Sequence, residues 1–176
     1  MIIWIIGLSG SGKTTIGKII YNKLRNKNKN TIFLDGDELR KIWGNDLGHE
    51  ITDRKENAKR ILKLCEFLDK QKINVICSIL SIFPNIQKQA RSKFKKYFQV
   101  YLEAPINILA TRDKNRVYKK YYKKQIKNVV GLDIKFPKPY KSDLTLKSYG
   151  KNTPSYLAKK IVLKIKLKWA LFFIYY

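Results

Sequence analysis

The sequence predicts an α/β fold of three layers, in which a parallel sheet carries helices on both faces. Two observations predict this fold. Apolar runs that are typical of buried strands alternate along the chain with segments of helical periodicity. The first run, residues 2–6, leads directly into a glycine-rich loop that opens a helix. Because such a strand–loop–helix unit needs a crossover, the strands are expected to be parallel.

The elements are expected in the following order. Strands are predicted at residues 2–6, 31–35, 74–79 and 98–103, with a short last strand at 143–148. Helices are predicted at residues 15–25, 38–43, 84–96 and 105–112, and from about residue 154 onward. A long helix is expected to begin at Asp53, because Asp53 and Glu56 have the spacing of a capping box.

The loop Gly7-Leu-Ser-Gly-Ser-Gly-Lys-Thr-Thr15 fits the phosphate-binding pattern. Its glycines allow backbone N–H groups to surround a phosphate, and the following helix points its positive end at the same place. Lys13 is expected to reach the β- and γ-phosphates, and the Thr14 hydroxyl to take a magnesium position. The predicted nucleotide-binding residues are Gly7, Ser9, Gly10, Ser11, Gly12, Lys13, Thr14 and Thr15.

Length and composition indicate one domain, residues 1–176, with 44% hydrophobic residues, which excludes a disordered chain. Cys65 and Cys77 lack metal-site spacing and are expected to be buried, reduced thiols. The net charge is +25, but the lysines are spread along the whole chain. We therefore expect mostly solvated surface, and nucleic acid is an unlikely partner. Because no basic segment precedes the first apolar run, no signal peptide and a cytoplasmic location are expected.

Two segments do not fit the regular alternation. Residues 113–131 are rich in lysine and lack a clear apolar face, so they are either an exposed helical loop or, the favoured interpretation, a mobile basic lid over the nucleotide. The basic and aromatic tail, about residues 157–176, ends in the apolar run 169–176, which is too short to span a bilayer. Packing of this run on the body or on a second subunit is favoured over a peripheral membrane contact.

Asp35-Gly36-Asp37 places two carboxylates where a predicted strand ends, at the edge of the sheet where ligands bind. One carboxylate can hold magnesium through water, and the other can accept a proton from an attacking hydroxyl. Alone, such a tripeptide is more often a turn. Arg40, Arg54 and Asn57 follow and can bind an anionic acceptor. Together these residues predict phosphoryl transfer from ATP to a small anionic molecule.

Further motifs make the sequence resemble the adenylylsulfate (APS) kinase family. They are the loop 7–15, Leu34-Asp-Gly-Asp-Glu-Leu-Arg40, Asp46-Leu-Gly48, Asp53-Arg-Lys-Glu-Asn57, Val100-Tyr-Leu-Glu-Ala-Pro105, Arg112-Asp113, Tyr118-Lys-Lys120, Ile126-Lys-Asn128, Gly131-Leu-Asp133 and Pro139. The resemblance implies a P-loop kinase fold, a homodimer, and transfer of the ATP γ-phosphate to the ribose 3′-hydroxyl of adenylyl sulfate. It also implies that the lid is residues 113–131.

The resemblance further implies roles for individual residues. Lys13, Asp35 and Asp37 would be catalytic, and Thr14 and Asp35 would hold Mg²⁺, partly through water. The implied acceptor-binding residues are Asp37, Arg40, His49, Arg54, Asn57, Leu80, Ser81, Lys119 and Val129. Some family members can be phosphorylated at the serine that matches Ser81, which is assigned only a pocket role here.

The departures from the family pattern concern the acceptor. His49 and Val129 stand where the family has two phenylalanines that sandwich adenine, and the segment 81–84 lacks a family arginine. The entry to the lid, 113–118, also differs. This pattern resembles the cytidine diphosphoramidate kinases of capsule synthesis. Cytidine diphosphoramidate is therefore slightly favoured over adenylyl sulfate as the acceptor. One alternative function is an APS kinase in which His49 stacks on adenine. A remote alternative is a basic nucleic-acid-binding protein. For His49 itself, a plain surface position also stays open.

Overall fold

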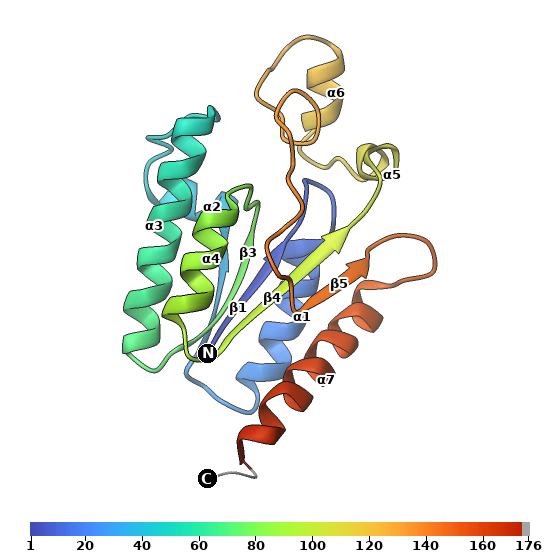
Figure 1. The fold of residues 1–176 in the computed structure, drawn as a ribbon. Coiled ribbons are helices and arrows are strands. Elements are labelled where there is room, and N and C mark those ends of the chain that lie inside the picture. The colour runs from blue at the N-terminus through green and yellow to red at the C-terminus, as the bar shows by residue number, and fades with distance from the viewer. Residues whose placement is uncertain (174–176) are drawn as a thin grey trace.

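The computed structural model describes residues 1–173, which form a five-stranded parallel sheet flanked by helices (Figure 1). The strands are β1 (Ile2–Ile6), β2 (Thr31–Asp35), β3 (Asn74–Ile79), β4 (Tyr97–Glu103) and β5 (Leu144–Lys147). Their order across the sheet is β2-β3-β1-β4-β5, and all neighbours are parallel. The predicted α/β fold is confirmed. Because β1 is central, the phosphate-binding loop leaves the middle of the carboxyl edge of the sheet.

Helices cover both faces of the sheet. One face carries α1 (Lys13–Arg25) and α7 (Pro154–Phe173), whereas α2 (Gly36–Ile42), α3 (Ile51–Lys70) and α4 (Pro84–Lys93) cover the other. The short helices α5 (Ile106–Thr111) and α6 (Val117–Tyr122) lie beyond the carboxyl edge, in the chain that follows β4 (Figure 1). In the described part of the chain, no helix is both long and apolar enough to cross a membrane.

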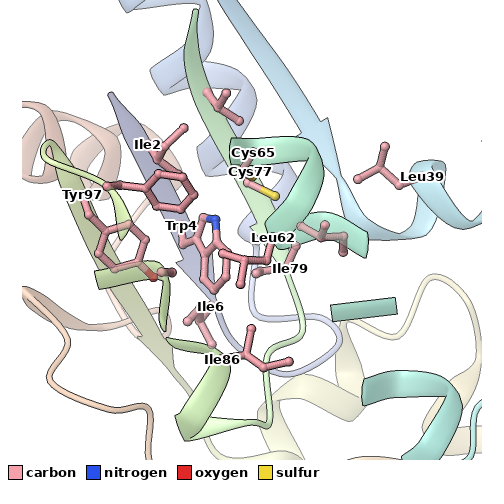
Figure 2. Packing of buried hydrophobic residues seen from close by; sticks show 14 residues of the cluster. Ile2, Trp4, Ile6, Leu39, Leu62, Cys65, Cys77, Ile79, Ile86 and Tyr97 are labelled. Carbon is pink, nitrogen blue, oxygen red and sulfur yellow. The ribbon is translucent and has the colours of Figure 1, made fainter. Parts of the chain in front are cut away.

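Strand β1 is apolar throughout because its residues face both layers of helices. Ile3 and Ile5 pack with α1 and α7, whereas Ile2, Trp4 and Ile6 pack with α3 and α4 (Figure 2). The Trp4 ring meets the Tyr97 ring edge-on at a centroid distance of 5.6 Å. Cys65 and Cys77 are buried free thiols in the same cluster, as the sequence predicts.

Several predicted helix boundaries differ from the structure by one to three residues. Helices α1 and α2 each begin two residues before the predicted start. Helix α3 begins at Ile51, because its capping box is formed by Glu50 and Asp53, whose carboxylate accepts the backbone N–H of Glu50 at 3.3 Å. Asp53 is therefore the third residue of the helix and not its N-cap. Helix α4 ends at Lys93 because Phe94 takes an extended conformation that buries its side chain in the core.

Helix α7 packs on the sheet through its inner side. Up to position 170, its buried residues are Leu157, Ala158, Ile161, Ile165 and Trp169. The Trp169 ring lies 6.1 Å from the Phe98 ring of β4, in an edge-on arrangement. The end of the tail that the sequence analysis considered, residues 174–176, lies outside the described residues.

Candidate functional site

The phosphate-binding loop depends on two left-handed glycines. Gly10 has φ 75° and Gly12 has φ 86°, a conformation that L side chains rarely adopt. A Cβ atom on Gly10 would also lie 2.9 Å from the Leu109 carbonyl oxygen. Inside the loop, the Ser11 hydroxyl is buried and finds no hydrogen-bond partner among residues 1–173. A backbone cradle with an unsatisfied buried hydroxyl fits a phosphate ligand.

Lys13 lies at the start of α1 with its ammonium group turned back onto the loop. Its Nζ donates to the Leu8 carbonyl oxygen at 2.8 Å. Burial lowers the pKa of Lys13 to about 8, although the nearby carboxylates of Asp37 and Asp35 act in the opposite direction. The loop therefore holds a cation whose charge responds to pH near neutrality.

Thr14 and Asp35 bring two oxygen atoms together next to the loop. The Thr14 hydroxyl donates to one carboxylate oxygen of Asp35 at 2.6 Å. The other carboxylate oxygen caps α2 by accepting the backbone N–H of Asp37 at 3.0 Å. Ser78 of β3 donates to the Lys13 carbonyl oxygen at 3.0 Å, which fixes the first turn of α1 on the sheet. A hydroxyl and a carboxylate are ligands that suit Mg²⁺, so this pair fits that ion.

A pocket lies beside the loop, between α2, α3 and the end of β3. It is lined by Trp4, Gly36, Asp37, Arg40, His49, Arg54, Asn57, Ala58, Ile61, Ile79, Leu80 and Ser81. The structure thus brings together most of the predicted acceptor-binding residues, namely Asp37, Arg40, His49, Arg54, Asn57, Leu80 and Ser81. Asp37 joins the two halves of the site, because it lines the pocket and follows the capping residue Asp35 by two positions.

The two pocket arginines hold a loop in place. Arg40 donates from Nη1 to the carbonyl oxygens of Leu47 and Gly48, at 3.1 and 3.0 Å. Arg54 donates from Nε to the carbonyl oxygen of His49 at 2.8 Å and from Nη2 to that of Asn128 at 2.7 Å. Partial burial lowers the pKa of both guanidinium groups, but arginine stays charged at neutral pH. The pocket is therefore cationic, and Arg54 links it to the segment 113–131.

His49 and Asn57 give the pocket its neutral polar groups. Burial lowers the pKa of His49, and the charges of Arg54 and Arg40 lower it further, so the imidazole is neutral at pH 7. Asn57 is 9% exposed, and its side-chain oxygen has no hydrogen-bond partner in the part of the chain that the structure describes. A ligand that brings a donor to this oxygen would satisfy a buried acceptor.

Two of the predicted acceptor-binding residues do not line this pocket. Val129 is 5% exposed and packs in a cluster that also contains Leu8, Leu109 and Tyr118. Lys119 is exposed on α6. Their roles toward an acceptor stay predictions.

The segment 113–131 has an apolar side that the sequence analysis missed. Tyr118 is 1% exposed, and its hydroxyl donates to the carbonyl oxygen of Ser9 in the phosphate-binding loop at 3.0 Å. The Asp113 carboxylate accepts the backbone N–H groups of Val117 and Tyr118, at 2.8 and 2.7 Å, which fixes the start of α6. The spacing of Val117, Tyr118 and Tyr121 is the signal that would have indicated an anchored helix.

The pocket lining also includes five residues that were not predicted as acceptor-binding, namely Trp4, Gly36, Ala58, Ile61 and Ile79. The Nε1 atom of Trp4 is buried and has no hydrogen-bond partner in the described part of the chain.

Comparison with known proteins gives consistent results. A family model described as adenylylsulphate kinase matches residues 1–147. Similar proteins include a cytidine diphosphoramidate kinase of Campylobacter jejuni, which is 43% identical over 168 residues, or 94% of each chain. They also include an adenylyl-sulfate kinase of Clostridium acetobutylicum, 36% identical over 149 residues, which are 84% of this chain and 74% of the relative.

Solved structures share the fold. The Mycobacterium tuberculosis APS kinase, determined in complex with AMPPNP and APS, has a TM-score of 0.85 at 27% identity, over 94% of this chain and 96% of that one. A shikimate kinase of Aquifex aeolicus has a TM-score of 0.58 at 21% identity, over 96% and 98% of the two chains, which shows the fold alone.

Proposed function

The chain belongs to the adenylylsulphate kinase family and is a phosphotransferase, and from this premise we propose that it transfers the γ-phosphate of ATP to the ribose 3′-hydroxyl of a small nucleotide. The acceptor that we favour is cytidine diphosphoramidate, and adenylyl sulfate is the alternative. The proposed phosphoryl transfer rests on one observation: a phosphate-binding loop and a cationic pocket meet at Asp37.

On the donor side, the residues of the loop would hold the triphosphate. Backbone N–H groups between Gly10 and Thr15 would surround the phosphates, and Lys13 would leave the Leu8 carbonyl oxygen to reach the β- and γ-phosphates. Thr14 and Asp35 would hold Mg²⁺, which neutralises charge that develops on the phosphates. The low local polarity that lowers the pKa of Lys13 also strengthens its attraction to an anion.

On the acceptor side, Asp37, which lines the pocket, would accept the proton of the attacking hydroxyl. In this step the acceptor oxygen forms a bond to the γ-phosphorus, the bond from the γ-phosphorus to the bridging oxygen breaks, and ADP leaves. Arg40 and Arg54 would bind the anionic group of the acceptor, and Asn57 would accept a hydrogen bond from its base. Because substrate binding aligns the two reactants, these residues contribute to rate as well as to affinity.

Two observations favour the cytidine compound. The similarity to the Campylobacter jejuni cytidine diphosphoramidate kinase covers nearly the full length of both chains. In addition, the residues that line the pocket within the described chain include no phenylalanine, and Val129 faces a core cluster instead. Each lost aromatic face removes about 1–3 kcal/mol of base stacking, and the smaller pyrimidine depends on stacking less than adenine does.

The experiment is ADP release from magnesium-ATP with each acceptor in turn: cytidine diphosphoramidate, adenylyl sulfate, CDP and AMP. Turnover of the cytidine compound well above the other three supports the favoured acceptor, whereas preferred turnover of adenylyl sulfate establishes the alternative. Identification of the phosphate position on the product by NMR tests the 3′-hydroxyl. Absence of acceptor-dependent ADP release with all four compounds would contradict the proposed acceptor class.

Two further properties stay proposals. We propose that the protein is a homodimer and acts in the cytoplasm, as the family resemblance implies. Size-exclusion chromatography with light scattering would give the number of subunits, and cell fractionation would give the location.

A further inference from the structure

The outer side of α7 carries exposed apolar residues among lysines. Tyr156, Leu163 and Leu167 are 45%, 58% and 56% exposed. Their spacing of seven and four residues places them along one side of the helix, opposite the residues that pack on the sheet. The exposed lysines of α7 are Lys159, Lys160, Lys164 and Lys166. Burial of the inner side therefore leaves a second amphipathic stripe that faces outward.

This side of the molecule carries no carboxylate side chain on its helices. Neither α1 nor α7 contains Asp or Glu, and neither does the connection 26–30. On the opposite side of the sheet, by contrast, α3 contains four acidic residues: Asp53, Glu56, Glu66 and Asp69. A general excess of lysine would raise the charge of both sides, but it does not explain why acidic residues are missing from one of them. The positive charge of α1 and α7 is therefore not offset by any acidic side chain of these two helices.

A groove between α1 and α7 adds a concave apolar strip. Its volume is about 440 Å³, and its lining residues are Lys23, Leu24, Asn26, Lys27, Lys159, Val162, Leu163 and Lys166. Leucine and valine side chains supply the apolar part of this lining, and lysines of both helices lie beside them. A lining of apolar side chains and lysines matches a ligand that has an anionic head and an apolar chain.

We propose that this lysine–leucine face, formed by the outer sides of α1 and α7, binds an anionic membrane surface. The leucines would enter the boundary between headgroups and acyl chains, while the lysine stems lie along apolar surface with their ammonium groups on lipid phosphates. Each lysine near such a surface strengthens binding roughly fivefold.

Charge and residue type argue against two other occupants. In a symmetric dimer through this face, lysines would oppose lysines without any carboxylate of α1 or α7 to pair with them. A nucleic acid would use the cations, but half-exposed leucines gain nothing from phosphate contacts, and α7 contains no arginine. The membrane is the anionic partner that uses both residue types.

The location of the face leaves the active site free. The pocket is lined by residues of α2 and α3, on the opposite side of the sheet from α7. A molecule bound through the lysine–leucine face would therefore present its pocket to the solution, where a soluble nucleotide can enter.

The test is sedimentation of the full chain with vesicles in 0.15 M salt, where free surface charges are screened beyond about 8 Å. We expect binding to vesicles that contain phosphatidylglycerol and little binding to pure phosphatidylcholine. Lys159→Gln with Lys166→Gln should weaken the partition coefficient by about 25-fold. Leu163→Ser with Leu167→Ser should weaken it by roughly tenfold, because both side chains lose apolar burial.

Matched controls change the same residue types on the other side of the sheet. Lys63→Gln with Lys88→Gln, and Ile42→Ser with Phe67→Ser, alter exposed residues of α2, α3 and α4. These variants should bind vesicles as the parent does. ADP release is measured for every variant, because a misfolded variant loses this activity and can then be excluded.

Three results would overturn the proposal. The first is equal binding to neutral and anionic vesicles, or equal losses in the test and control variants. The second is a leucine variant that binds as the parent does, which would leave a purely ionic contact. The third is RNA binding or a subunit contact that depends on these residues in the absence of vesicle binding, which would assign the face to a nucleic acid or to a second copy.

Discussion

The phosphate-binding loop and the acceptor pocket share one edge of the sheet but are built in different ways. The loop is one continuous stretch whose shape depends on backbone conformations that only glycine adopts readily, at Gly10 and Gly12. The pocket is assembled from α2, α3 and the end of β3, and long arginine side chains position its loop through backbone carbonyls. A backbone-built site tolerates little change, whereas a side-chain-built site can change its ligand by substitution.

This difference predicts that loop variants affect every acceptor and that pocket variants affect one substrate. The largest effect is expected for Lys13→Ala, because the variant removes the cation that reaches the β- and γ-phosphates. We expect kcat to fall by about 10³-fold with any acceptor. Steady-state ADP release measures this loss, and a melting temperature near that of the parent shows that the fold is intact. A loss confined to one acceptor would contradict the division between loop and pocket.

A smaller, acceptor-specific effect is expected for Arg54→Lys. The guanidinium group donates to His49 and to Asn128 through different nitrogens, and an ammonium group cannot reproduce that fork. We expect KM for the acceptor to rise by about 10- to 100-fold while KM for ATP stays within about twofold.

Arg60→Lys is the matched control, since Arg60 lies on the same helix but pairs with Asp46 outside the pocket. This variant should leave both KM values unchanged. Equal increases in the two KM values for Arg54→Lys would show that Arg54 also supports the donor side.

His49→Phe tests whether position 49 contributes to the choice between the two acceptors. A phenyl ring would restore one of the two aromatic faces that the family uses for adenine. We expect the ratio of kcat/KM for adenylyl sulfate to that for the cytidine compound to rise by about tenfold. His49→Ala should produce no such rise, and an equal ratio in both variants would mean that position 49 does not contact the base.

Between pH 7 and pH 9 we expect a pH effect on the binding of ATP. Burial sets the pKa of Lys13 at about 8, so the ammonium is charged below that pH and loses its proton above it. ATP affinity should therefore weaken by roughly tenfold between pH 7 and pH 9. Titration calorimetry measures the change, and Lys13→Ala should bind ATP with a weak affinity that is independent of pH in this range. An unchanged affinity in the parent would show that Lys13 stays charged.

The sequence predicts the donor side well because its information is local. The strand, loop and helix between Ile2 and Arg25 are contiguous, and the predicted elements are present in the structure. The boundary errors arose where a second signal, either local or from the core, competed with the predicted one. Glu50 and Asp53 form the capping box of α3, although Asp53 and Glu56 have the same spacing. Phe94 ends α4 because burial of its ring in the core outweighs a helical pattern.

The acceptor side was harder to predict because its contacts join distant parts of the chain. The hydrogen bond from Arg54 to Asn128 spans 74 residues. The anchor of α6 on the phosphate-binding loop is even more distant in sequence, since the hydrogen bond from Tyr118 to Ser9 spans 109 residues. No spacing rule indicates such pairs. The resemblance to a family supplied the residues of the pocket, but the burial of Val129 among apolar side chains follows only from the three-dimensional packing.

The order of the pocket residues along the chain has a consequence for how such enzymes diversify. Apart from Trp4 and the short stretch 79–81, the lining residues all fall between positions 36 and 61. A single exchange of that segment between relatives would replace most of the acceptor-recognition surface and leave the nucleotide-binding segment untouched. New acceptor preferences are therefore accessible by recombination of one short gene fragment, and a chimaera across residues 36–61 is the natural starting point for redesign of this kinase.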